Sequence, residues 1–255
     1  MPDLKEPHFF GSDLRSEKFI RDELAYQRLF HGNDAVRFMG EASVYYLYSR
    51  TAAAEIHRFN PTAKVIMMLR NPVDMIHSLH SQAVSSANED ILDFAEALKA
   101  EEDRKRGARI PDIADFPQGL LYRDIGAYVQ QVKRFQQYFG SRQIKIILFD
   151  DFTQHPHRIY QEVLQFLGVE KVDFKVEFLV ENENRLLISE KLEHFIKRRT
   201  EIRRVLKNAT PFLYSSLYSA FRGLNAHNVV RQQMSPELRA EPVRLGGTTV
   251  DYIRG

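Results

Sequence analysis

Arg70 and Ser78 are the polar residues whose types and spacing best suit the binding of an anion. Arg70 directly follows the run 64–69, which has the length and apolar character of a buried parallel strand. Asn71 can cap a helix and Pro72 suits its first turn, so we expect a helix to begin beside the arginine. A guanidinium and the free N–H groups of a helix N-terminus together favour a phosphate or sulfate. Ser78 lies eight positions after Arg70 and can offer a hydroxyl from the same helix.

Each member of this pair also has a purely structural interpretation. Arg70 could pair with a nearby carboxylate, such as that of Glu41 or Asp74. Ser78 could be a small residue at a helix contact. The helix N-terminus expected beside Arg70 favours the anion, because ligands of open α/β sheets bind at the carboxyl ends of the strands.

The elements that must position these residues alternate between helices and strands. The apolar periodicity predicts helices over residues 16–30, 43–59 and 121–139, and strands over residues 36–39, 64–69 and 144–149. Strands that alternate with helices imply a parallel sheet. The charged segment 101–109 is expected to form an exposed helix end and a loop.

The composition is that of an ordinary folded domain. A chain of 255 residues with 44% hydrophobic content can bury a full core, and we expect one domain over residues 1–255. The 36 basic and 34 acidic residues give a formal net charge of only +2, so we expect no nucleic-acid partner. The absence of cysteine excludes disulfides and thiolate metal ligands and fits a reducing compartment, and we expect a cytoplasmic location. His155 and His157 bracket Pro156 in a turn and do not have the spacing of metal ligands, so we expect no metal site. No apolar run approaches the length of a transmembrane helix.

Several motifs of this chain, in their order, resemble the sulfotransferases that use 3′-phosphoadenosine-5′-phosphosulfate (PAPS). The pattern R-N-P-x-D-x-x-x-S that begins at Arg70 is similar to the motif that holds the 3′-phosphate of PAPS. Residues 5–10 (KEPHFF) resemble the segment on the acceptor side, and residues 40–43 (GEAS) the edge of the second strand. Residues 149–152 and 166–169 resemble a later strand and helix. The resemblance covers roughly residues 1–170 and looks closest to the bacterial and heparan-sulfate-modifying branch.

This resemblance implies a fold and a set of roles. The fold would be α/β, a P-loop-NTPase-like three-layer sandwich with a central parallel sheet. Glu6 aligns with the catalytic base and His8 with a histidine that orients the site, while Arg70 and Ser78 would hold the nucleotide. The substrate would be a small-molecule or carbohydrate acceptor with a hydroxyl or amine. The alternative is that Glu6 forms a solvated pair with Lys5 and that His8 is a surface imidazole.

Tyr122 and Tyr128 flank Gly126 in a pattern, Y-x-x-x-G-x-Y, that also resembles the family. Their hydroxyls could reach the acceptor or the nucleotide. Tyr128 keeps step with Ile125 and Val132 on the predicted helix, so we expect its side chain in the core.

Two departures from the family's pattern concern the substrates. Heparan-type members often carry a lysine where this chain has Ala42, which argues against a glycosaminoglycan acceptor. The family's first strand and its loop of the form P-K-x-G-T-T, which holds the 5′-phosphosulfate, have no counterpart before Lys5. Residues 246–249 (GGTT) superficially resemble that loop but lack the lysine, and we interpret them as a chance match.

We therefore expect an N-terminally truncated sulfotransferase domain that lacks its first strand and ends in an atypical tail over residues 241–255. Sulfonate transfer by this chain is expected to require the absent loop. A different interpretation is a non-catalytic remnant of the fold or an interaction protein. A third is a nucleoside or nucleotide kinase that shares the same kind of sheet.

Overall fold

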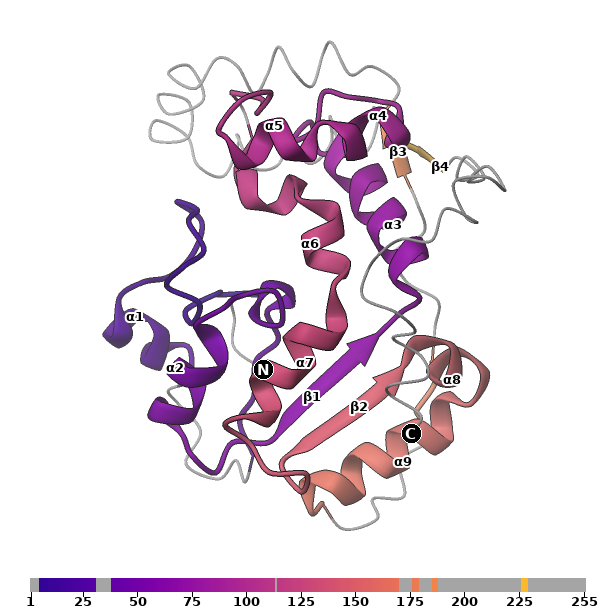
Figure 1. Cartoon of the computed structure of the whole chain (residues 1–255). Helices are drawn as coiled ribbons and strands as arrows, with labels where there is room; N and C mark the ends of the chain where they lie inside the picture. Colours follow the sequence, from indigo (N-terminus) through magenta and orange to yellow (C-terminus); the bar gives the residue numbers. More distant parts are fainter. Residues whose placement is uncertain are drawn as a thin grey trace, which may run out of the picture. The chain divides into compact units, whose positions relative to one another are not determined.

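The computed structural model describes residues 5–30, 38–112, 114–169, 176–178, 185–187 and 226–228 (Figure 1). The chain divides into two compact units. The first comprises Met1–Met75, Arg123–Phe178 and Pro242–Gly255, and the second comprises Ile76–Tyr122 and Leu179–Glu241. One domain over residues 1–255 stays a prediction, and the tail 241–255 lies outside the described residues.

A parallel pair of strands lies within the first unit (Figure 1). Strand β1 (Val65–Leu69) pairs with β2 (Ile144–Leu148), with Val65 opposite Ile144 and Leu69 opposite Leu148. The strands predicted over residues 64–69 and 144–149 are therefore confirmed to within one residue. Their parallel pairing confirms the expected α/β class.

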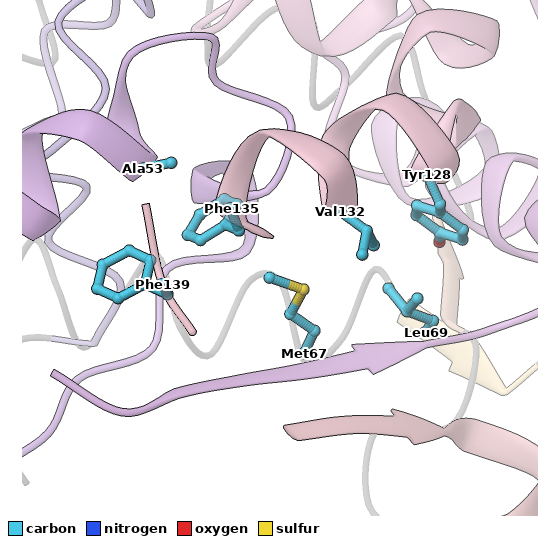
Figure 2. Close-up of a cluster of buried hydrophobic side chains, with 7 residues drawn as sticks. All are labelled: Ala53, Met67, Leu69, Tyr128, Val132, Phe135 and Phe139. Carbon is cyan, nitrogen blue, oxygen red and sulfur yellow. The ribbon is translucent and has the colours of Figure 1, made fainter. Parts of the chain in front are cut away.

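Helices cover both faces of this pair of strands. On one face, α7 (Tyr128–Gln136) packs its apolar side against Met67 and Leu69 of β1. Figure 2 shows the resulting buried cluster, which consists of Ala53, Met67, Leu69, Tyr128, Val132, Phe135 and Phe139. On the other face, Lys145 Nζ of β2 contacts Glu162 Oε2 of α9 (Pro156–Leu167) at 2.9 Å. The finer expectation of P-loop-like layering stays a prediction.

The cluster in Figure 2 supplies the main apolar support for β1. Met67 and Leu69 are 4% and 2% exposed, whereas Met68 between them is 48% exposed, so alternate residues of the strand face α7. Each fully buried side chain of this size stabilises the fold by about 1.5–3 kcal/mol relative to an exposed one. This packing fixes the carboxyl end of β1, where Arg70 follows.

The two helices before β1 are shorter than the sequence predicts. Within 16–30 only α1 (Glu23–Arg28) is helical, because the Asp22 carboxylate accepts the Ala25 N–H and begins the helix there. The helix predicted over 43–59 is divided into a 3₁₀ turn, η1 (Val44–Tyr46), and α2 (Ala52–Phe59). Ser49 Oγ accepts the Ala52 N–H at 2.9 Å, which favours the start of a new helix at this point.

Two further predictions about this unit also change. The strand predicted over 36–39 falls partly outside the described residues, and residues 38 and 39 are not in a strand. The helix predicted over 121–139 is interrupted at Ala127, so that α6 (Tyr122–Gly126) precedes α7. The Gln131 side chain donates to the carbonyls of Asp124 and Ile125, both at 2.9 Å, and so satisfies backbone groups that the interruption leaves open.

Helix α3 (Pro72–Ser85) begins where the sequence predicts. Asn71 Oδ1 accepts the N–H groups of Val73 at 3.0 Å and Asp74 at 3.4 Å. This is the geometry of an N-cap, and Pro72 occupies the first helical position, where no N–H is required.

The second unit contains a buried ion pair that the sequence analysis did not predict. Arg104 Nη2 of α5 (Glu101–Lys105) lies 2.7 Å from Glu89 Oε1, and the two side chains are 1% and 0% exposed. The Tyr122 hydroxyl donates to Glu89 Oε2 at 2.7 Å. The expectation that segment 101–109 is exposed is therefore wrong for Glu101 and Arg104, which are buried.

Five other elements complete the described part of the chain. They are α4 (Phe94–Lys99) and η2 (Pro117–Leu120) in the second unit, α8 (Phe149–Gln154) in the first, and the antiparallel pair β3 (Arg185–Leu187) and β4 (Ala226–Asn228). Residues 246–249 lie outside the described part of the chain.

Candidate functional site

Glu6 and His8 lie on an irregular loop, residues 5–14, in the first unit. Both have a backbone φ in the left-handed region, 58° for Glu6 and 48° for His8. For residues other than glycine this conformation costs about 1–3 kcal/mol, and it persists only where the surrounding structure imposes it. Such strain concentrates at functional sites, so its occurrence at both residues supports a functional loop.

The side chains of Glu6 and His8 face one another. Glu6 Oε2 lies 3.6 Å from His8 Nε2, and the His8 side chain is 6% exposed while that of Glu6 is 39% exposed. The adjacent His8 imidazole holds the pKa of Glu6 below its usual range, against the opposing effect of burial. A carboxylate with this pKa is ionised at neutral pH and is open to solvent on one side.

Aromatic rings enclose the imidazole of His8. Its centroid lies 4.5 Å from that of Phe19 and 5.3 Å from that of Tyr45. Burial and the charge of Glu6 raise the pKa of Tyr45 to about 12, so its hydroxyl keeps its proton at neutral pH. His8 Nδ1 is buried and forms no hydrogen bond within the described chain. The interpretation of His8 as a surface imidazole is therefore wrong.

The carboxylate of Glu41 supports the backbone of His8 through the hydroxyl of Ser43. The His8 N–H donates to Ser43 Oγ at 3.0 Å, and the Ser43 hydroxyl donates to Glu41 Oε2 at 2.8 Å. The hydroxyls of Tyr26 and Tyr46 both donate to Glu41 Oε1. Burial raises the pKa of each tyrosine, with the Glu41 charge as a further cause, so both remain donors. The sequence marked residues 40–43 as a strand edge but did not show this contact with His8.

Two further carboxylates, Asp13 within the loop and Glu55 outside it, attach the far end of the loop to residues 49–55. Glu55 of α2 accepts the N–H groups of Gly11, at 2.6 Å, and Ser12. Asp13 accepts the hydroxyls of Ser49 and Thr51 and the Arg50 N–H, which lies 2.8 Å away. Burial alone would raise the pKa of Asp13 and of Glu55, but these hydrogen bonds together outweigh it and lower both pKa values, so the charged forms stabilise the loop.

Arg70 lies at the carboxyl end of β1, beside the first residue of α8. Its guanidinium carbon is 5.4 Å from the centroid of the Phe149 ring. Within the part of the chain that the structure describes, Arg70 forms no ion pair with a carboxylate, and Glu41 is engaged by hydroxyl groups. The structure thus gives no support for pairing with Glu41 or Asp74. The arginine charge and the capped start of α3 share the edge of the sheet where ligands of α/β folds bind.

The other candidate residues have distinct environments. Ser78 is half-buried within α3, and its role as a phosphate contact stays a prediction. Tyr128 belongs to the buried cluster on β1, as its periodicity predicts. Tyr122 is fully buried with its hydroxyl on Glu89, so this hydroxyl cannot reach an acceptor or a nucleotide.

The described residues contain neither a candidate metal centre nor a helix that could span a membrane. Within these ranges, no group of histidine, aspartate and glutamate side chains could hold a metal ion. None of the helices that could be described is long and apolar enough to cross a membrane.

Known proteins resemble this chain in both sequence and structure. A model of the sulfotransferase domain matches residues 7–211, which is most of the chain. Among solved structures, the chain is similar to the crystal structure of a sulfotransferase from Alicyclobacillus acidocaldarius. The two are 36% identical over 71% of this chain and 75% of that chain, with a TM-score of 0.62. No curated protein matches the chain. Because the family model and the solved structure agree over most of its length, this chain belongs to the sulfotransferase family.

Proposed function

We propose that this protein transfers a sulfonate group from PAPS to a hydroxyl or amine of a small-molecule or carbohydrate acceptor. Membership in the sulfotransferase family supports the reaction class. The observation that carries the mechanism is the Glu6–His8 pair. It joins a partly exposed, ionised carboxylate to a buried imidazole at 3.6 Å, on backbone held in the left-handed region.

In this mechanism Glu6 is the general base. As the acceptor oxygen or nitrogen forms its bond to sulfur, the bond from sulfur to the bridging phosphate oxygen breaks. The acceptor proton passes to Glu6, and 3′-phosphoadenosine-5′-phosphate leaves with the electron pair of the broken bond. His8 orients the Glu6 carboxylate through the contact between Nε2 and Oε2.

Arg70 and Ser78 would hold the 3′-phosphate of the nucleotide. Arg70 is suited to this role because it makes no carboxylate ion pair among the described residues and follows the carboxyl end of β1. The adjacent N-terminus of α3 adds the positive end of a helix dipole. A planar guanidinium can bind a phosphate through two hydrogen bonds, which favours the phosphorylated nucleotide over the unphosphorylated one.

Transfer of labelled sulfonate from PAPS to a panel of hydroxyl and amine acceptors tests this proposal. The assay uses the protein expressed from its complete reading frame. Glu6→Gln keeps the shape of the side chain but removes the base, so turnover should fall by about 10²-fold or more while nucleotide affinity is retained. Glu17→Gln, at an exposed position of the same region, is the matched control and should leave turnover unchanged.

The outcomes separate the alternatives. Equal turnover by the parent protein and Glu6→Gln would show that Glu6 is not the base. Tight nucleotide binding without transfer to any acceptor would contradict the enzymatic proposal and favour a non-catalytic binding protein.

A further inference from the structure

We propose that Arg21 is a positioning residue that holds loop 5–14 in the conformation in which Glu6 and His8 meet. This inference rests on the proposed function of that pair, because it explains how the pair is kept in place. Arg21 does not touch the reacting groups of either side chain. It binds the backbone carbonyls of His8 and of residues that follow it.

The Arg21 guanidinium donates hydrogen bonds to five backbone carbonyls of this loop. Nη1 contacts the carbonyls of His8 at 2.8 Å, Phe9 at 2.8 Å and Phe10 at 3.3 Å, and Nη2 contacts those of Gly11 at 3.0 Å and Leu14. The carbonyls of four successive residues, 8–11, thus turn toward one cation. Converging carbonyl dipoles repel one another, and a positive charge at their focus offsets that repulsion.

The residues just before Arg21 bind the same loop. The Ile20 N–H donates to the Pro7 carbonyl at 3.0 Å, between the two residues with positive φ. The Phe19 ring packs on the His8 imidazole, and the Arg21 guanidinium carbon lies 5.4 Å from the centroid of that ring. Three consecutive residues therefore contact the backbone or side chain of the segment that carries Glu6 and His8.

Loss of the Arg21 contacts should rearrange the loop without unfolding the protein. The far end of the loop remains attached through Glu55 and Asp13, and the His8 N–H remains bonded to Ser43. The strained backbone at Glu6 and His8 would then relax, because the contacts that oppose relaxation are reduced. We expect the two side chains to separate.

Arg21→Lys is the decisive variant because it keeps the charge but removes the planar group that reaches several carbonyls at once. In the transfer assay, kcat should fall about tenfold or more at unchanged nucleotide affinity, since small misplacements of catalytic groups have large effects on rate. In Arg21→Ala, added guanidinium ion should restore part of the lost kcat. Arg28→Lys and Arg28→Ala, at an exposed position of α1, should show neither effect.

A second measurement does not depend on activity. Titration of the Glu6 carboxyl carbon by NMR should give a pKa below the usual range in the parent protein, and a higher pKa in Arg21→Lys. The charged or titratable groups that face Glu6 are His8, Lys5 and Tyr45, and of these His8 contributes most to lowering the pKa. Separation from His8 therefore raises the pKa, whereas Arg28→Lys should leave it unchanged.

An unchanged Glu6 pKa in folded Arg21→Lys would overturn the positioning role, whatever the activity. A raised pKa in this variant, combined with a parent protein that transfers no sulfonate, would keep the positioning role and reject the proposed function. Circular dichroism of each variant shows whether it is folded. If Arg21→Lys proved unfolded, Arg21 would be a residue required for folding and the proposal would fail.

Discussion

Glu6 owes its low pKa mainly to His8, and this contact sets the pH range in which the carboxylate can accept a proton. A base functions above its pKa, so a lowered pKa extends activity toward acid pH. His8→Asn removes the imidazole but keeps a polar side chain. We predict that it shifts the midpoint of the acid limb of the kcat/KM profile to higher pH, toward the ordinary glutamate pKa of about 4.3. A pH–rate profile of both proteins measures this limb. An acid limb that stays at the parental position would show that His8 does not control Glu6.

Glu6 and His8 lie two positions apart in the sequence. The resemblance to sulfotransferases implies that Glu6 is the catalytic base and that His8 orients the site. The sequence could not predict their backbone conformation. The contacts that impose it come from distant positions, such as Ser43, which lies 35 residues from His8, and Arg21, which lies 13 residues from it. Positive φ is uncommon for residues other than glycine, and neither residue type marks the position at which it occurs, so the strain is visible only in the tertiary structure.

Within loop 5–14, the backbone at Gly11 leaves little room for a side chain. This residue has a φ of +83°, and a Cβ there would lie 2.9 Å from Ser49 Oγ. We predict that Gly11→Ala destabilises the protein by about 2–3 kcal/mol, since it combines backbone strain with overlap against Ser49. Urea unfolding measures the change, and sulfonate transfer should fall with it because the loop carries Glu6.

Gly168, at the end of α9, provides the matched control. Its φ of +78° is similar, but a Cβ there would meet no atom within 4 Å. Gly168→Ala should therefore cost only the conformational part, about 1 kcal/mol. Equal destabilisation by the two substitutions would show that the contact with Ser49 adds nothing.

The elements near Arg70 were the most predictable from sequence. The strands β1 and β2 are continuous apolar runs, and Asn71 with Pro72 marks the start of α3, so local chemistry and tertiary structure agree there. The helices predicted over 16–30, 43–59 and 121–139 were too long. Side chains of Asp22, Ser49 and Gln131 bond to the backbone where these helices begin or break, which periodicity of apolar residues does not report.

In the molecule as a whole, the buried ion pair between Glu89 and Arg104 is an independent stabilising feature of the second unit. We predict that Arg104→Met destabilises the protein by about 3–5 kcal/mol, because it leaves the Glu89 carboxylate buried without its cation. Arg106→Met removes a 70% exposed partner of Asp103 and should cost at most about 1 kcal/mol. Chemical unfolding at neutral pH compares the two, and similar losses would contradict the buried-pair account.

The same ion pair predicts how stability depends on pH. Arg104 and Tyr122 bond to Glu89 and lower its pKa in the folded state, although burial opposes this. The stabilisation is therefore present above the unfolded pKa of about 4.3 and is lost as the pH falls through the folded value. Glu89→Gln should flatten the loss of stability in acid, measured by urea unfolding between about pH 3 and 6. A profile as steep as that of the parent protein would assign the acid sensitivity to other carboxylates.

The sequence could not predict this pair, because the segment 101–109 is strongly charged and its composition favours an exposed surface. Glu89, Arg104 and Tyr122 lie far apart in sequence and are joined only by tertiary folding. Mutual satisfaction of their polar groups is what makes burial tolerable, and no single residue of the three signals it.

Calorimetric titration of 3′-phosphoadenosine-5′-phosphate tests most directly whether this sulfotransferase holds the PAPS nucleotide at Arg70. We predict binding by the parent protein, with a preference over adenosine 5′-phosphate, and a loss of about 1.5–3 kcal/mol in Arg70→Ala through a broken charge-assisted hydrogen bond. Arg142→Ala, at an exposed position before β2, should bind as the parent does. Equal affinity of the parent protein and Arg70→Ala, or no preference for the 3′-phosphate, would contradict the account.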